Sequence, residues 1–230
     1  MINEKYALYE NLLREWSAKM NLVAPSTLTN IRERHIMDSA QLAEHIPAGA
    51  TAIDLGSGAG FPAVVLAILG HRVIAIESIA KKCRFLETLK STLDLPNLTI
   101  INDRAENLFQ TVRRIKNRQC EGNTIRNVQA LHECSCFLRN QGNFTRPDPK
   151  KYIITARAFA PLVRIFDWAA STKIPYLLLK GENLESEIAI ARKKYQFDYS
   201  LIPSQTGPGF ILSVGDVKPI AYCRQKTKKI

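Results

Sequence analysis

The residues best suited to chemistry form a glycine-rich stretch, Gly56-Ser57-Gly58-Ala59-Gly60, that directly follows the short apolar run Thr51 to Leu55. Glycines in such a turn permit positive φ angles and let backbone N–H groups approach a ligand without a Cβ in the way. The dinucleotide fingerprint places a third glycine five positions after the first, where this chain has Phe61. The spacing therefore disfavours NAD.

An acidic residue, Glu77, ends the next apolar run. A carboxylate at the end of the second strand of such a unit can accept hydrogen bonds from both hydroxyls of a ribose. The loop and the acid together predict an adenosine-type cofactor, S-adenosylmethionine, held by Gly56, Gly58 and Glu77. The alternative is that the glycines only make a turn and that Glu77 is a surface acid at a strand end.

The elements that would position these residues alternate between strands and helices. Short strands are expected at 51–55, 72–77, 98–101, 152–155, 176–179 and 210–214, with helices at 61–69, 79–93 and between the later strands. Alternation of this kind predicts an α/β fold, a doubly wound and mostly parallel sheet of the Rossmann-like type covered on both faces.

Two segments fall outside this alternation. Apolar residues at helical spacing predict a small helical extension over residues 1–48, which leaves 49–230 as the main domain. Residues 110–149 have no sustained periodicity and are rich in Asn, Gln, Arg and Cys, so we interpret them as an irregular basic insertion.

The net charge of +11 favours a polyanionic partner, because lysine and arginine near phosphates release condensed counterions. Between Gln110 and Lys151, however, nine basic and three acidic residues carry six of those eleven charges. The five cysteines are irregularly spaced and predict free thiols, with neither disulfides nor a metal site. The longest apolar run is too short to span a bilayer, and the N-terminus has no secretory signal, so a cytoplasmic protein is expected.

Seven blocks, in order along the chain, resemble the ribosomal small-subunit methyltransferase G family, also called GidB. They are Trp16 to Leu22, Arg34 to Ser39, Ile53 to Pro62, Glu77-Ser78 with Lys81 to Leu86, Arg104 to Glu106, Ala156 to Ala158, and Lys180-Gly181. The sequence departs from the family at Ala63, where glycine is usual, and in the insertion, where the family is much shorter.

The resemblance implies a class I S-adenosylmethionine-dependent methyltransferase that methylates N7 of a guanine in 16S rRNA, in the 530 loop at position 527. It also implies that Gly56 and Phe61 line the methionine end of the cofactor pocket, that Ala105 and Glu106 lie by the adenine, and that Arg157 contacts the cofactor site. The expected partner is 16S rRNA or the 30S subunit, and the expected state is a monomer. A methyltransferase acting on another substrate, or an RNA-binding or assembly protein that has lost the cofactor, remains an alternative.

Guanine N7 has a free lone pair, so no general base is expected, and no catalytic residue is assigned. Candidates for RNA contact are Lys19, Arg34, His35, Lys81, Lys82 and Lys180. Arg34 could instead pair with Asp38, four residues on, and His35 could be a buried, hydrogen-bonded histidine on the apolar side of its helix. Lys81 and Lys82 begin a helix, where positive charge opposes the helix dipole, and they could equally form a solvated basic face.

Overall fold

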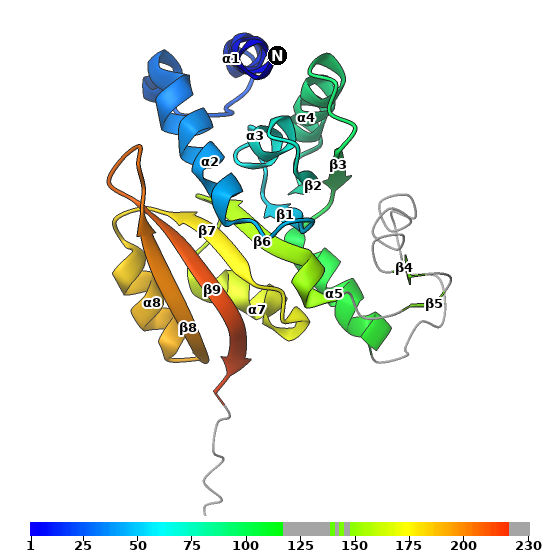
Figure 1. The fold of residues 1–230 in the computed structure, drawn as a ribbon, viewed down its shortest axis with the longest axis vertical. Helices are drawn as coiled ribbons and strands as arrows, with labels where there is room; N and C mark the ends of the chain where they lie inside the picture. The colour runs from blue at the N-terminus through cyan, green and yellow to red at the C-terminus, as the bar shows by residue number, and fades with distance from the viewer. Residues whose placement is uncertain (117–138, 141–142, 145–147, 221–230) are drawn as a thin grey trace, which may run out of the picture.

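The computed structural model describes residues 1–116, 139–140, 143–144 and 148–220. Its centre is a seven-stranded sheet (Figure 1). The strands lie in the order β3 (Leu98–Asn102), β2 (Arg72–Glu77), β1 (Thr51–Leu55), β6 (Tyr152–Arg157), β7 (Tyr176–Lys180), β9 (Phe210–Pro219) and β8 (Tyr195–Pro203). The first five are parallel, and β9 runs antiparallel to both β7 and β8. The predicted doubly wound, mostly parallel sheet is confirmed.

The sheet is buried on both faces because its central strands carry apolar residues at successive positions, and alternate side chains enter two different cores. Ala52 of β1 packs with α3 (Ala63–Ile68) and α4 (Ala80–Thr92), whereas Ile53 packs with α5 (Ala105–Lys116), α7 (Leu162–Ala169) and α8 (Leu184–Arg192). Figure 1 shows α3 and α4 on one side of the sheet and α5, α7 and α8 on the other. Both layers of helices therefore hold the strand ends in fixed positions.

The N-terminal residues are helical, as expected, but they form several short pieces after the first helix. α1 (Ile2–Ser17) is followed by a 3₁₀ segment, Pro25–Asn30, a π-helical turn, Arg32–Met37, the short α2 (Asp38–Ala40) and a second 3₁₀ segment, Gln41–His45. Tyr9 and Leu13 of α1 are fully buried in the same core as Phe85 of α4. The division of the chain at residue 48 stays a prediction, and these residues contribute to the core of the sheet domain.

The structure adds one strand that the sequence reading missed and shortens the irregular segment. β8 was expected to be part of a region of helices, but Tyr195 and Phe197 alternate with exposed residues and pair with β9 across a bulge. The helix α5 continues to Lys116, so the first residues of the predicted insertion are helical. Two short strands, Arg139–Asn140 and Asn143–Phe144, pair within it, and residues 117–138, 141–142 and 145–147 lie outside the described residues.

Cys83 is a buried free thiol, as predicted, and the other cysteines (Cys120, Cys134, Cys136 and Cys223) lie outside the described residues. Among the described helices, none is long and apolar enough to cross a membrane. The described ranges also contain no cluster of three or more His, Cys, Asp or Glu side chains arranged to hold a metal ion.

Candidate functional site

The chain reverses its direction of winding at β1, because β2 flanks that strand on one side and β6 on the other. In doubly wound sheets a crevice opens at this point, outside the carboxyl ends of the strands. The glycine loop leaves β1 there, Glu77 ends β2, Arg157 ends β6 and Lys180 ends β7. Parallel register therefore brings four of the predicted site residues to one edge of the sheet.

The glycine loop adopts a conformation that requires glycine. Gly56, Gly58 and Gly60 have φ angles of 68°, 52° and 95°. The N–H groups of Gly56 and Ser57 both donate to the Ile76 carbonyl of β2, at 2.8 and 3.0 Å. A Cβ on Gly56 would lie 2.0 Å from Cδ2 of Phe159, so this residue permits close approach of the ring as well as a left-handed backbone.

Glu77 holds the loop and the start of α4 together. One carboxylate oxygen accepts from the Gly58 N–H at 2.9 Å and the other from the Ile79 N–H at 2.8 Å, and the residue is 5% exposed. Each carboxylate oxygen can accept a second hydrogen bond. The predicted ribose contact is compatible with this position, because Glu77 lines a cavity, and it stays a prediction.

That cavity has a volume of about 380 Å³ and also contains Gly56, Ala105 and Glu106. Lys82, Asp103, Arg104, Phe159, Arg164 and Trp168 contribute to its walls. Burial tends to raise the pKa of Glu106, but hydrogen bonds and nearby arginines outweigh it and lower that pKa. The structure thus gathers four predicted cofactor residues, Gly56, Glu77, Ala105 and Glu106, in one place, which we call the first cavity.

A second cavity, about 780 Å³ in volume, shares a wall with the first. The shared wall is Ala158-Phe159-Ala160, directly after β6. Ala158 has a φ of 47°, a left-handed conformation that costs an alanine on the order of 1–2 kcal/mol. This strained turn aims Phe159 over Gly56, and the ring lies 5.7 Å from that of Trp168. Phe159 therefore divides the two cavities.

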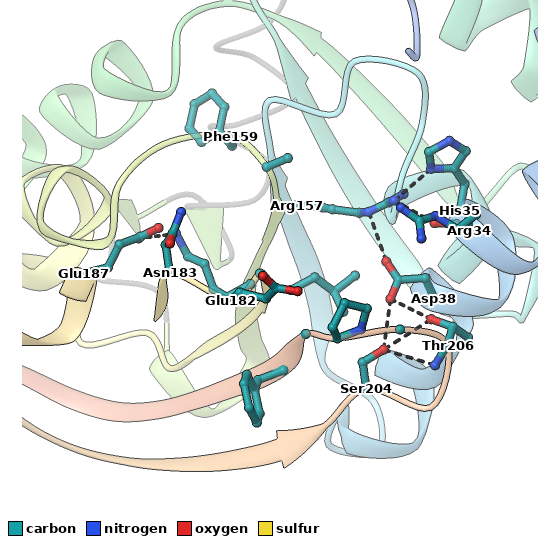
Figure 2. A pocket seen from close by; sticks show the side chains of 18 of the residues that line it. Arg34, His35, Asp38, Arg157, Phe159, Glu182, Asn183, Glu187, Ser204 and Thr206 are labelled. Carbon is teal, nitrogen blue, oxygen red and sulfur yellow. Dashed lines mark hydrogen bonds and ion pairs between the residues drawn. The ribbon is translucent and has the colours of Figure 1, made fainter. Parts of the chain in front are cut away.

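Arg157 lines the second cavity, not the first, and the N-terminal segment holds it there (Figure 2). Its Nε forms an ion pair with Asp38 at 3.1 Å, and its Nη2 donates to the Arg34 carbonyl and to Nδ1 of His35, both at 2.8 Å. The alternative pairing of Arg34 with Asp38 was wrong, because Asp38 is engaged by Arg157 instead. Arg34 is exposed and lines the same cavity.

His35 is the buried, hydrogen-bonded histidine that the sequence allowed, at 7% exposure. An arginine can only donate, so Nδ1 must be the acceptor, and Nε2 then carries the proton and donates to Thr27 at 2.8 Å. Burial, with the charges of Arg157 and Arg34, lowers the pKa of His35 to about 4. The imidazole is therefore neutral near pH 7, and both of its nitrogens are hydrogen bonded.

Phe61 lies beneath this arrangement and is not among the residues that line either cavity. Its ring stacks between those of Tyr9 and His35, at centroid distances of 5.1 and 5.0 Å, and the Arg157 guanidinium lies 5.6 Å from it. Tyr9 in turn donates a hydrogen bond to the Ala59 carbonyl at 2.6 Å. The cofactor contact expected of Phe61 stays a prediction, and the observed contacts make it a support for Arg157.

The four lysines proposed for RNA contact differ in their surroundings. Lys19 and Lys81 are exposed, and Lys82 is half-buried in the wall of the first cavity. Lys180 is 10% exposed, pairs with Glu187 at 2.7 Å and donates to the Ala160 carbonyl at 2.9 Å. These contacts give Lys180 a role in holding the turn after β6, so its predicted RNA contact needs a test of its own.

Sequence reasoning missed the residues that surround Arg157. Asp38 was considered only as a partner of Arg34, although Asp38 Oδ1 accepts from Ser204 and Thr206 on the turn between β8 and β9, at 3.3 and 3.0 Å. Nothing in the local sequence joins positions more than 160 residues apart. The missed strand β8 is what brings that turn to the site.

The chain is similar to known proteins both in sequence and in fold. A sequence model described as GidB, rRNA small subunit methyltransferase G, matches residues 2–146. A protein named ribosomal RNA small subunit methyltransferase G from Dinoroseobacter shibae is 37% identical to this chain, over 91% of this chain and 93% of its own length. The protein of the same name from Gluconobacter oxydans is 35% identical, over 95% of both chains. Among solved structures, a mutant of MtNAS in complex with S-adenosylmethionine has a TM-score of 0.51 at 11% identity, covering 93% of this chain and 76% of that one, which supports the fold alone.

Proposed function

Because this chain belongs to the rRNA small subunit methyltransferase G family, we propose that it transfers a methyl group from S-adenosylmethionine to N7 of a guanine in the 530 loop of 16S rRNA. That it is an S-adenosylmethionine-dependent methyltransferase acting on small-subunit rRNA follows from the family. The guanine, its N7 atom and the 530 loop are our proposal. We also propose a monomer acting in the cytoplasm, where ribosomal subunits are found.

The first cavity is our proposed adenosine site, and its residues fit that group. Glu77 offers carboxylate oxygens to ribose hydroxyls, and the small side chain of Ala105 and the rings of Phe159 and Trp168 offer apolar surface to a purine. A Cβ would strain the backbone of the loop at both Gly56 and Gly58 at their observed φ, and at Gly56 it would also collide with Phe159. The methionine end would extend past Gly56 toward the shared wall.

The second cavity is our proposed site for the target nucleotide, and the wall that it shares with the first cavity is the observation that carries this proposal. When bound, the cofactor supplies a methyl group on a positively charged sulfur. Guanine N7 can accept it without losing a proton, so the protein needs only to align the two groups and exclude water. His35 agrees with this view, since both of its nitrogens are already hydrogen bonded and its pKa is lowered to about 4.

Labelled S-adenosylmethionine and 30S subunits lacking this modification test the proposal. We expect the label in 16S rRNA and chain cleavage at a 7-methylguanine within the 530 loop. Label in rRNA at another nucleotide would contradict the proposed target and leave the family assignment intact. Calorimetry with S-adenosylmethionine tests the site separately, since a protein that binds no cofactor would have to act as an assembly factor.

A further inference from the structure

Asp38 occupies a place where three distant parts of the chain meet. It begins α2, directly after the π-helical turn Arg32–Met37, and its side chain is 18% exposed. One carboxylate oxygen, Oδ2, pairs with Arg157 at the end of β6. The other, Oδ1, accepts from Gln41 and, as Figure 2 shows, from Ser204 and Thr206. The N-terminal segment, the end of β6 and the turn between β8 and β9 therefore share one carboxylate.

These contacts fix the guanidinium of Arg157 on several sides. Nε forms an ion pair with Asp38, and Nη2 donates to the Arg34 carbonyl and to His35. The Phe61 ring lies against the guanidinium. Within the described part of the chain Nη1 has no hydrogen-bond partner, and Arg157 lines the second cavity. One nitrogen with two N–H donors is thus available to a ligand in that cavity.

An arginine alone would be a poor neighbour for the proposed reaction. Methyl transfer from a sulfonium moves positive charge onto the acceptor ring, and an unpaired guanidinium beside that ring would oppose the transfer. Paired with Asp38, the guanidinium can donate hydrogen bonds while its charge is offset. Burial lowers the pKa of Arg157, and the charge of Asp38 opposes that shift.

We propose that Asp38 is a positioning residue for methyl transfer, which holds Arg157 at the wall of the second cavity, directs Nη1 to the target nucleotide and offsets the arginine's charge. This inference rests on the proposed function of that cavity. It assigns Arg157 to the acceptor side, whereas the resemblance placed it at the cofactor.

The test compares Asp38→Asn with Glu33→Gln, which removes one negative charge from an exposed position in the same segment. Misplacing a group by about 1 Å can cost on the order of a hundredfold in rate. For Asp38→Asn we expect kcat with 30S subunits to fall by roughly tenfold to a hundredfold, with KM for subunits changing less than about threefold, because the interaction acts in the transition state. The calorimetric Kd for S-adenosylmethionine should match that of wild type, and Glu33→Gln should retain full activity.

Two further variants separate positioning from a structural role. Gln41→Leu removes one contact of Oδ1 at a residue that does not line the second cavity and leaves the pair with Arg157, so it should lose far less activity than Asp38→Asn. Adding Asp38→Asn to Arg157→Lys should cost little more than Arg157→Lys alone, because both changes disrupt one unit.

The outcomes distinguish the two levels of inference. A wild-type protein that binds S-adenosylmethionine but methylates no rRNA contradicts the proposed function, and the role of Asp38 falls with it. An active wild type in which Asp38→Asn behaves like Glu33→Gln, or weakens cofactor binding instead of kcat, overturns the positioning role alone. Equal losses from Asp38→Asn and Gln41→Leu would also overturn it, in favour of an anchor for the turn between β8 and β9, which Gln41 also contacts.

Discussion

Gly56 shows how one missing methyl group can matter to a cofactor site. Its φ of 68° and its contact with Phe159 mean that alanine would be strained and would also collide with the ring. For Gly56→Ala we expect a loss of stability of about 1–2 kcal/mol from the backbone alone and a weakening of S-adenosylmethionine binding by roughly tenfold or more. Thermal unfolding and calorimetry measure the two effects.

Gly49→Ala is the matched control, because Gly49 has a φ of 75° and no atom within 4 Å of an added Cβ. It should show the strain without the loss of affinity. If the two variants bind the cofactor equally well, Phe159 and the loop do not limit the site.

Asp54 is a fully buried carboxyl beneath the glycine loop, hydrogen bonded by Thr155 at 3.1 Å. Burial raises the pKa of Asp54 to about 7, from an ordinary value of 3.8. Between about pH 4 and pH 7 the folded protein therefore keeps a proton that the unfolded chain has already released. The stability that this group contributes is fully present at low pH and is lost as the pH rises through 7.

Asp54→Asn removes that dependence, since an amide does not titrate. The stability of the variant relative to wild type should increase as pH rises from about 5 to 8, measured by thermal unfolding across that range. Gln196→Asn, an amide-for-amide change at an exposed position, should give a constant difference. A constant difference for Asp54→Asn as well would mean that the native carboxyl is ionised throughout.

At the scale of elements, α1 is connected to the glycine loop by the Tyr9 hydroxyl and to Arg157 by the stack of Tyr9, Phe61 and His35. For Tyr9→Phe the ring remains and the buried Ala59 carbonyl loses its donor, which should cost about 1–3 kcal/mol. Denaturant unfolding measures this loss. Tyr6→Phe, on the same helix, is the control, because the Tyr6 hydroxyl makes no hydrogen bond with the described residues and its removal should cost less. Equal losses would show that the hydrogen bond adds nothing to the ring packing.

Elements were predictable where a local pattern carried the information. The strands β1 and β2 and the loop between β1 and α3 followed from apolar runs and glycines, and Gly56 and Glu77 line one cavity as a result. Ala105 and Glu106, which only the family resemblance indicated, line the same cavity. The surroundings of Arg157 were not predictable, because they depend on the hairpin of β8 and β9 and on contacts across more than 120 residues. Alternating aromatics at Tyr195 and Phe197 were the available signal for β8.

At the scale of the whole molecule, the residues that flank the insertion keep their places at the proposed site. Ala105 begins α5 and Arg157 ends β6 in register with β1, so the residues on either side of the segment keep the places that the fold requires. The net charge of +11 has two parts, six charges between residues 110 and 151 and five in the rest of the chain.

Salt dependence can separate these two parts, because each phosphate contact adds roughly 0.7–0.9 to the slope of log affinity against log salt concentration. Arg34→Gln with Lys81→Gln removes two charges, from the wall of the second cavity and the exposed start of α4, and should reduce the slope for 30S subunits by up to about 1.4–1.8. Arg118→Gln with Arg126→Gln removes the same charge from the insertion and should leave the slope unchanged. The affinity of each double variant for 30S subunits is measured over a series of salt concentrations. An equal reduction of the slope in both variants would make the basic insertion part of the RNA interface.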